Sequence, residues 1–248
     1  MKTAIITGAS SGIGNELAKA LAKQGYRLGL IARRIELLDE LRRGSPSEVL
    51  IQPSDLNNPE KSFEDFKGLW DRLGQVDCVF LNAGVSLPSD SLSWENDRNM
   101  LHVNASSFTA MAGESLRRFL KQGYGHLVGV SSIAGIRGSG RAPVYGATKA
   151  YISNYLQGLR QQVKALNPSI HVTDIRPGFV DTDMVRSAPA KFWVSSPANA
   201  ARQILAAVHT RKRMVYVSRR WSLAAYLYAA LPEFLLERIY ARYLKRES

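Results

Sequence analysis

Short apolar runs alternate with longer amphipathic stretches along most of the chain. Apolar runs of four to six residues are typical of buried strands, and apolar residues spaced three and four apart predict helices. Seven strands are expected, at Thr3–Thr7, Arg27–Ala32, Val49–Gln52, Val76–Leu81, His126–Ser131, His171–Arg176 and Arg213–Val217. Helices are expected between them, at Gly12–Gln24, Ile35–Arg42, Pro59–Leu73, Ala105–Gln122, Val144–Leu166 and Pro197–His209.

This alternation of strands and helices predicts the architecture. Strands that are apolar almost throughout are typical of a parallel sheet covered on both faces, and right-handed crossovers then give a doubly wound, Rossmann-type sheet. In such sheets ligands bind beyond the carboxyl ends of the strands. The 248 residues contain no internal repeat or Pro/Ser-rich linker, so we expect a single α/β domain with a mainly parallel seven-stranded sheet.

A glycine-rich turn follows the first predicted strand and opens the first predicted helix. It reads Gly8-Ala-Ser-Ser-Gly-Ile-Gly14. Glycines allow the backbone to turn tightly and to approach a diphosphate, and the helix N-terminus supplies free N–H donors. The position between a strand and an amphipathic helix favours a phosphate-binding turn over an ordinary strand–helix connection.

Tyr145 and Lys149 stand four residues apart in a predicted helix, so both side chains project from the same helical face. A free phenol titrates near pH ~10 and exchanges protons poorly at neutral pH, whereas a nearby ammonium stabilises the phenolate. The spacing therefore predicts a tuned general acid/base. A Tyr–Lys pair at this spacing also occurs by chance on many helices, so the pair alone does not decide the function.

Taken together, the motifs resemble the short-chain dehydrogenase/reductase family, in its single-domain branch. Thr7–Gly14 has the G-x-x-x-G-x-G spacing of that family's cofactor turn, and Asn82-Ala-Gly84 matches its motif after the fourth strand. Pro177-Gly178, with Thr182 following, matches its motif after the sixth strand. The resemblance covers residues 1 to about 217 in the right order.

The resemblance implies a catalytic set of Asn104, Ser132, Tyr145 and Lys149, with Ser132 thirteen residues before Tyr145. Tyr145 would exchange a proton with the substrate oxygen while a hydride moves to or from nicotinamide, and Lys149 would lower the pKa of Tyr145 and hold the nicotinamide ribose. Ser132 would hydrogen-bond the carbonyl oxygen, and Asn104 would anchor a water that connects Lys149 to solvent. For Ser131, a strand-end serine bonded to backbone is the favoured interpretation.

The cofactor-binding positions follow from the same motifs. They are Gly8, Ser10, Ser11, Gly12, Ile13, Gly14, Arg33, Arg34, Asp55, Leu56, Asn82, Ala83, Gly84, Tyr145, Lys149, Pro177, Gly178, Val180 and Thr182. The resemblance assigns Asp55 and Leu56 to the adenine, although Asp55 would also serve as a helix cap before Pro59.

The end of the second predicted strand indicates which dinucleotide binds. Enzymes that select NAD usually carry an acidic residue there, which accepts a hydrogen bond from the ribose 2′-hydroxyl. This chain has Ala32 at that position, followed by Arg33 and Arg34. A guanidinium suits bidentate binding of a 2′-phosphate, so NADP is expected. The alternative is that the arginines are simply solvated at a strand end, above all Arg34.

The loops beyond the strands, at 86–94, 133–144 and 181–194, should form the substrate pocket. They contain Leu87, Ile136, Pro143, Met184, Phe192 and Trp193, a lining that favours an apolar or aromatic carbonyl compound. Arg137 and Arg141 would meet an anionic substrate or, more simply, water. The single cysteine, Cys78, lies in an apolar run where a buried thiol is expected, and neither cysteine nor histidine spacing indicates a metal site.

The net charge is +12, and from Arg211 to Ser248 nine basic residues face three acidic ones. Residues 1–218 are expected to form the NADP-binding catalytic domain, and 219–248 a basic, aromatic helical extension packed on or near it. The apolar run Leu223–Leu231 is too short to cross a bilayer, which takes ~20 residues. The extension could cover the substrate cleft or a subunit interface, touch a membrane surface, or dock a partner; nucleic acid is not expected.

The sequence therefore predicts an NADP-dependent oxidoreductase that interconverts a carbonyl and a secondary alcohol. The alternatives are a membrane-surface reductase of lipid-like ketones (acyl, retinoid or steroid) and an NADP-binding regulatory protein without turnover. The resemblance implies a homodimer or homotetramer, and the start of the chain, with no signal peptide, fits a cytoplasmic protein.

Overall fold

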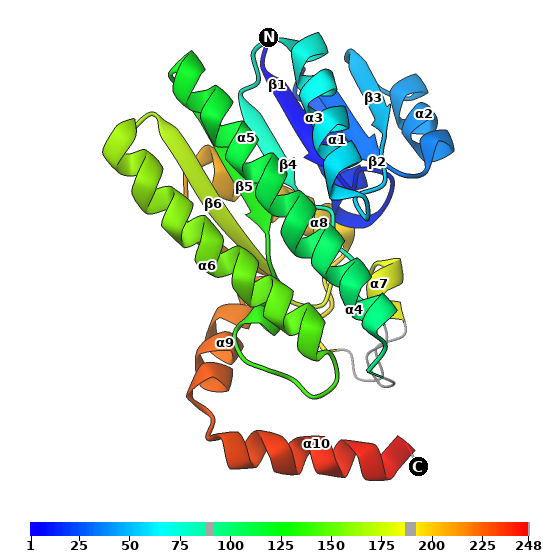
Figure 1. The fold of residues 1–248 in the computed structure, drawn as a ribbon, viewed down its shortest axis with the longest axis vertical. Helices are drawn as coiled ribbons and strands as arrows, with labels where there is room; N and C mark the ends of the chain where they lie inside the picture. Colours follow the sequence, from blue (N-terminus) through cyan, green and yellow to red (C-terminus); the bar gives the residue numbers. More distant parts are fainter. Residues whose placement is uncertain (88–91, 187–191, 248) are drawn as a thin grey trace.

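Seven parallel strands form one sheet in the order β3-β2-β1-β4-β5-β6-β7 (Figure 1). The structure is a computed structural model that describes residues 1–87, 92–186 and 192–247. The strands are β1 Thr3–Thr7, β2 Arg27–Ala32, β3 Val49–Pro53, β4 Cys78–Leu81, β5 Gly125–Val130, β6 Ile170–Pro177 and β7 Met214–Val217. The predicted seven-stranded, doubly wound sheet is thus confirmed.

The helices include the six expected between the strands, and α4, α7, α9 and α10 are additional. They are α1 Gly12–Lys23, α2 Ile35–Arg43, α3 Pro59–Leu73, α4 Trp94–Leu101, α5 Ser107–Gln122, α6 Pro143–Leu166, α7 Asp183–Arg186, α8 Pro197–His209, α9 Trp221–Ala230 and α10 Glu233–Glu247. The helix expected from Ala105 instead begins at Trp94, because a π-helical turn at His102–Ser106 joins α4 to α5 without a break. β4 begins at Cys78, where its pairing with Ala4 of β1 starts.

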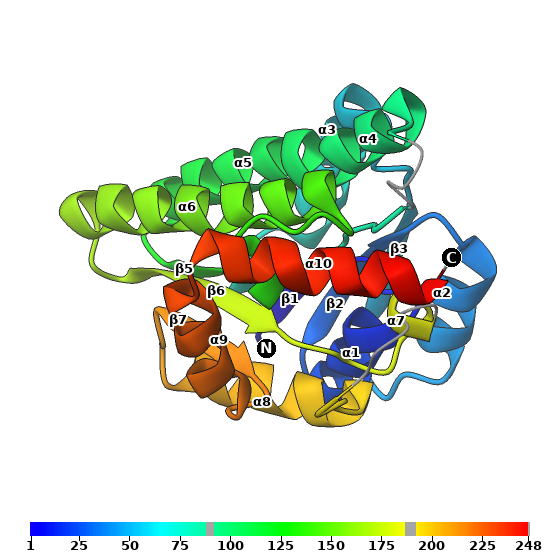
Figure 2. The ribbon, with the colours of Figure 1, turned by 90° about the horizontal axis from the view of Figure 1, so that it is seen from below.

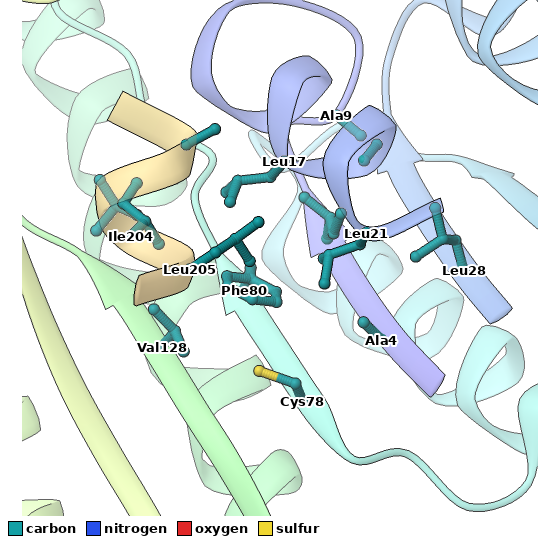
Figure 3. Close-up of a cluster of buried hydrophobic side chains, with 14 of the residues drawn as sticks. Ala4, Ala9, Leu17, Leu21, Leu28, Cys78, Phe80, Val128, Ile204 and Leu205 are labelled. Atoms are coloured by element: carbon teal, nitrogen blue, oxygen red, sulfur yellow. The ribbon is translucent and has the colours of Figure 1, made fainter. Parts of the chain in front are cut away.

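Alternate side chains of the central strands enter two separate apolar cores, one on each face of the sheet. On one face Ala4 and Ile6 of β1 pack with α1 and α8, and Figure 3 shows Leu17 and Leu21 of α1 meeting Phe80, Ile204 and Leu205 there. On the other face Ile5 of β1 packs with α3, α5 and α6 through residues such as Phe66, Phe119 and Leu156. Cys78 belongs to the first core, and burial raises the pKa of its thiol, as expected for a structural cysteine.

The sheet topology leaves room for a site beyond the carboxyl ends of the strands. β1 lies between β2 and β4, so the chain leaves β1 toward one side of the sheet and returns to pair on its other side. Crossover helices on opposite faces diverge at such a point, and the loops after the two strands flank a crevice. Figure 2 looks onto this carboxyl edge and shows α7, α9 and α10 on the same side of the molecule.

Candidate active site

A groove of about 460 Å³ lies beyond the carboxyl ends of the strands. The loops that follow β1, β2, β3, β4 and β5 and the end of β6 all line it. Its lining includes Gly8, Ser10, Ser11, Gly12, Ile13, Arg33, Arg34, Asp55, Leu56, Asn82, Ala83, Gly84, Ser132, Tyr145, Lys149, Pro177, Gly178, Val180 and Thr182. The structure thus brings together all the residues assigned to the candidate site except Gly14 and Asn104.

The glycine-rich turn is held in place by the loop that follows β4. Thr7 Oγ1 accepts hydrogen bonds from the backbone N–H groups of Asn82 and Ala83, each 3.1 Å long, and Asn82 Nδ2 donates to the carbonyl of Gly8 at 3.3 Å. Gly14 does not line the groove because it faces the turn. A Cβ there would lie 2.2 Å from the Gly8 carbonyl oxygen, so a glycine is needed for α1 to pack against the turn.

The turn also has the shape that a diphosphate requires. Gly8 has φ +68°, and a Cβ at this position would come within 2.8 Å of the Ala83 backbone, so only glycine fits. The turn leads directly into α1, whose first N–H groups are free to bind an anion. These residues therefore fit the pyrophosphate of a dinucleotide.

Arg34 reaches back across the groove to the glycine-rich turn. Its Nη2 donates to Ser10 Oγ at 3.0 Å and to Ser11 Oγ at 2.7 Å. The side chain is exposed but held, which differs from the solvated strand-end arginine considered from the sequence. Together with Arg33, which lines the same groove, it forms a cationic end well suited to an additional phosphate.

Helix α6 presents Tyr145 and Lys149 to the opposite end of the groove. Lys149 is 3% exposed, its Nζ lies 5.7 Å from the centre of the Tyr145 ring, and it donates to the carbonyl of Val130 at 3.0 Å. The Tyr145 side chain is half-buried, and its hydroxyl lies 3.9 Å from the sulfur of Met184. Ser132, buried after β5, lines the same end of the groove, where its Oγ accepts from the Ala134 N–H at 3.1 Å.

The protonation of this pair differs from the expectation that Lys149 lowers the pKa of Tyr145. Removal from water raises the pKa of the phenol, and the hydrogen bond from Ser132 only partly opposes that effect. Burial also lowers the pKa of Lys149 to about 8, against the attraction of Asp174. At neutral pH the phenol is therefore protonated and the ammonium is mostly charged, the state required of a proton donor.

Asn104 lies behind the pair rather than in the groove. It is completely buried in the π-helical turn, its Oδ1 accepts from the Val85 N–H at 2.8 Å, and its Nδ2 donates to the Val85 carbonyl and to Thr148 Oγ1. A Cβ at Gly84 would lie 3.0 Å from Lys149 Nζ and 3.3 Å from Asn104 Oδ1, so the three residues are close neighbours. The side-chain amide fixes the loop after β4; the proton relay through Asn104 stays a prediction.

One charged residue beside the site was not identified from the sequence. Asp174 is 2% exposed in the middle of β6, where its carboxylate accepts from Ser131 Oγ at 2.5 Å and from Arg176 Nε at 2.7 Å. It is also the residue whose charge raises the pKa of Lys149. Ser131 donates its one hydroxyl proton to this carboxylate, while its Oγ also lies 3.1 Å from the Ile175 carbonyl oxygen, so its role is more than the expected backbone contact. An acidic residue next to the apolar Ile175, inside a strand predicted to lie within the sheet, was the available signal.

The substrate end of the groove is bounded partly by segments from the end of the chain. Met184 lines the groove, while Phe192 and Trp193 pack against Trp221, tilted and edge-on, at 5.0 and 5.5 Å between ring centres. Arg137, expected to meet an anion or water, instead donates to the backbone carbonyls of Leu231 and Ala229. Parts of the predicted pocket loops, 88–91 and 187–191, lie outside the described residues.

Comparison with known proteins places this geometry in a family. The sequence profile described as "short chain dehydrogenase" matches residues 2–192. An uncharacterised oxidoreductase of Myxococcus xanthus is 35% identical over 188 residues, which are 74% of this chain and 74% of that relative. An uncharacterised oxidoreductase of Listeria innocua is 30% identical over 207 residues, or 82% of this chain and 84% of the relative.

Solved structures agree with the sequence relatives. An alcohol dehydrogenase from the archaeon Thermococcus sibiricus, complexed with 5-hydroxy-NADP, superimposes with a TM-score of 0.75 and 29% identity over 87% of this chain and 95% of that one. A short chain dehydrogenase/reductase from Burkholderia phymatum in complex with NAD has a TM-score of 0.79 over 91% and 92% of the two chains, and at 19% identity it supports the fold alone. From the sequence match, the fold and the arrangement of the groove, this chain belongs to the short-chain dehydrogenase family of oxidoreductases.

Proposed function

We propose that this protein is an NADP-dependent oxidoreductase that interconverts a carbonyl and a secondary alcohol, with Tyr145 as the general acid/base. The observation that carries the proposal is the placement of Tyr145 and the buried Lys149 on one face of α6, with Lys149 Nζ 5.7 Å from the centre of the Tyr145 ring, at the end of a groove whose other end is the glycine-rich turn. A reduced nicotinamide supplies a hydride to a carbonyl carbon when it is bound. The residues of this chain supply the proton and the orientation.

Each catalytic side chain has a distinct part in carbonyl reduction. The Tyr145 hydroxyl donates its proton to the carbonyl oxygen, and the positive charge of Lys149 favours the phenolate that remains. Ser132, which lines the groove together with Tyr145, provides a second hydrogen bond to the same oxygen as negative charge develops on it. Asn104 keeps the loop at Gly84 and Val85 in position behind Lys149.

The choice of NADP rests on the cationic end of the groove. Ala32 leaves no carboxylate at the end of β2, and the Arg34 guanidinium already spans Ser10 and Ser11 at the rim of the phosphate-binding turn. A 2′-phosphate would replace these neutral hydroxyl partners with a charged one, which strengthens the hydrogen bonds of a guanidinium. The half-exposed Met184, Phe192 and Trp193 at the other end favour an apolar or aromatic substrate.

The proposal extends to the organisation of the protein. Residues 1–218 form the catalytic unit and 219–248 an extension packed against it through Trp221 and Arg137. We further propose that the protein assembles as a homodimer or homotetramer in the cytoplasm, as other members of the family do. The extension would also touch a membrane at its surface.

The test is a screen for NADPH oxidation across aldehydes, diketones, quinones, steroids and 3-oxoacyl thioesters, with wild type and Tyr145→Phe in parallel. We expect at least one carbonyl class to be reduced by wild type, and the rate to fall about 10³-fold in Tyr145→Phe because the proton donor is gone. NADPH binding, measured by its fluorescence, should change less than about threefold because the phenyl ring keeps its packing. Rapid turnover by Tyr145→Phe would refute the assigned role, and tight NADPH binding with no turnover on any class would favour the regulatory alternative.

A further inference from the structure

Large exposed apolar side chains are concentrated at the end of the molecule that carries the groove. They come from three separate segments: the start of α4, the segment before α8, and the two C-terminal helices. In these three segments, the side chains with more than two fifths of their surface exposed are Leu92, Trp94, Met184, Phe192, Trp193, Val194, Leu223, Tyr226, Leu227, Phe234 and Ile239. Figures 1 and 2 place α4, α7, α9 and α10 at the carboxyl ends of the strands, and in Figure 2 α10 crosses in front of them. We call these residues the apolar rim.

The C-terminal helices are fixed to the walls of the site. Trp221, 4% exposed, packs on Phe179 and Phe192, and a Cβ at Gly178 would collide with its indole nitrogen. On the other side the carbonyl of Leu231 accepts from Arg137, and Tyr240 of α10 lies against Gly140 in the loop that leads into α6. Met184 of the rim lines the groove itself, and α9 is held against Gly178, another residue of the groove wall, so the rim has a defined orientation relative to Tyr145.

The helix that contributes most to the rim has no charge. The ten residues of α9 contain no acidic or basic side chain, yet only Trp221 and Ala225 are buried, while Leu223, Tyr226 and Leu227 are 58–75% exposed. Apolar area of this kind is costly to leave in water. No helix in the described ranges is long and apolar enough to cross a bilayer, so a membrane would have to be met at its surface.

The charge next to this apolar surface is positive. The extension 219–248 has six basic and three acidic residues, among them Arg219 and Arg220 at the start of α9 and Arg238 and Arg242 on α10, all exposed. The other three basic residues of the C-terminal region, Arg211, Lys212 and Arg213, precede β7. They therefore lie at the amino ends of the strands, on the side of the sheet opposite to the groove. Basic side chains beside exposed aromatic and aliphatic ones match an anionic lipid surface, where the cations meet headgroups and the apolar groups enter the acyl boundary.

We infer that the apolar rim and its arginines dock the enzyme on an anionic membrane surface, with the mouth of the groove toward the lipid. This inference deepens the proposed function and rests on it for one consequence: the substrate would be an apolar carbonyl compound dissolved in the membrane, which reaches Tyr145 without crossing bulk water. The alternative occupant of the rim is a second copy of the chain. Association between two copies would not depend on the charge of lipid headgroups.

The test is co-sedimentation of the full chain with phosphatidylglycerol/phosphatidylcholine vesicles and with phosphatidylcholine vesicles alone. We expect binding to the anionic vesicles that weakens at high salt, and much weaker binding to the neutral ones. The variant Leu223→Glu/Leu227→Glu should lower the partition coefficient by at least about tenfold, because two exposed apolar side chains become anionic. Leu166→Glu is the matched control: Leu166 is 63% exposed against 65% for Leu223, but it ends α6 far from the rim.

Other outcomes would overturn the inference. Equal sedimentation of wild type and the double variant, or sedimentation of neither, would remove lipid as the occupant. A change in oligomeric state by light scattering, without vesicle binding, would assign the rim to contact between copies. Reduction of a water-soluble carbonyl compound should be equal in wild type and double variant; if it is absent in both while vesicle binding holds, the proposed function fails and the docking surface stands.

Discussion

At the scale of single residues, the candidate site depends on how a buried ammonium keeps its charge. Lys149 has almost no contact with water, and its one described hydrogen bond is to the neutral carbonyl of Val130. The compensating charge is on Asp174, which is itself held by Ser131 and Arg176. The carboxylate therefore acts through Lys149 and touches neither the proposed substrate position nor the hydroxyl of Tyr145.

Asp174→Asn should consequently change the pH dependence of the reaction. Because Lys149 is charged below a pKa of about 8, carbonyl reduction should decline as the pH rises through that value. Without the carboxylate the pKa of Lys149 falls further, so the alkaline limb of kcat/KM should move to lower pH by about one unit. Ser131→Ala, which removes a contact of Asp174 but no charge, should leave the limb near its wild-type position. An unmoved limb in Asp174→Asn would show that this residue is only structural.

Arg34 is the second residue whose position leads to a measurable expectation. Since its guanidinium already faces Ser10 and Ser11, Arg34→Ala should weaken NADPH binding by about ten- to a hundredfold, and NADH binding by less than about threefold. Arg33→Ala should show the same preference. Fluorescence titration of both reduced cofactors measures this, and equal losses for NADPH and NADH would contradict the choice of NADP.

At the scale of elements, the site is built by contacts between loops that are far apart in the chain. Thr7 ends β1, and its hydroxyl accepts from the backbone N–H groups of Asn82 and Ala83 after β4. This contact couples β1 and β4, the two strands whose following loops flank the crevice. The phosphate-binding turn is thereby supported by a second loop before any ligand is bound. A loss of this contact should affect both stability and cofactor binding.

Thr7→Val tests that coupling with little change in shape. It leaves two backbone N–H groups without their acceptor, which should cost about 1–3 kcal/mol of unfolding free energy, and it should weaken dinucleotide binding as well. Thr3→Val, at the other end of the same buried strand, is the control, because Thr3 lies away from this loop. Urea unfolding and NADPH titration measure the two effects. Identical behaviour of both variants would mean that the Thr7 hydroxyl has no special role.

What could be predicted from the sequence depends on the range of the interactions concerned. The strands, the glycine-rich turn and the Tyr145–Lys149 spacing follow from local patterns, and the predicted sheet is the observed one. The hydrogen bonds of Asn104 with Val85 and Thr148, the bond from Arg137 to Leu231 and the bond from Ser131 to Asp174 join segments that are far apart in the chain. The raised pKa of Tyr145 depends on burial, which spacing along a helix does not reveal.

At the scale of the whole molecule, the buried histidine of β5 makes stability depend on pH. His126 is 7% exposed and hydrogen-bonds Thr173 Oγ1 at 2.8 Å. Because the Thr173 hydroxyl donates to the carbonyl of Lys212, the His126 Nε2–H is the donor in that bond. Burial, with the nearby His171 and Arg211, lowers the pKa of His126 to about 3. The folded protein therefore keeps this ring neutral where an unfolded chain would protonate it.

The unfolding free energy should thus fall as the pH decreases from about 6.5 toward 3, by up to about 1.4 kcal/mol per pH unit from this residue. The unfolded chain binds the proton throughout that window and the folded chain does not. In His126→Gln the plot of unfolding free energy against pH should become less steep by about 1.4 kcal/mol per pH unit, which corresponds to one proton, whatever the effect on stability at pH 7. His209→Gln, at an exposed position, should leave the slope unchanged. Urea unfolding between pH 7 and pH 4 gives the slopes, and an unchanged slope in His126→Gln would disprove this account.

The construction of the groove has a consequence for the energetics of the entire chain. Its walls come from residues between Gly8 and Val185, contributed by the ends of six strands, so the binding surface exists only when these six strands are assembled. A dinucleotide that occupies it must then be released before the protein unfolds, and its binding free energy adds to the global stability: about 2.7 kcal/mol at a concentration of 100 Kd. The shift in melting temperature with NADPH or NADH alone would therefore rank the two cofactors before any substrate is known.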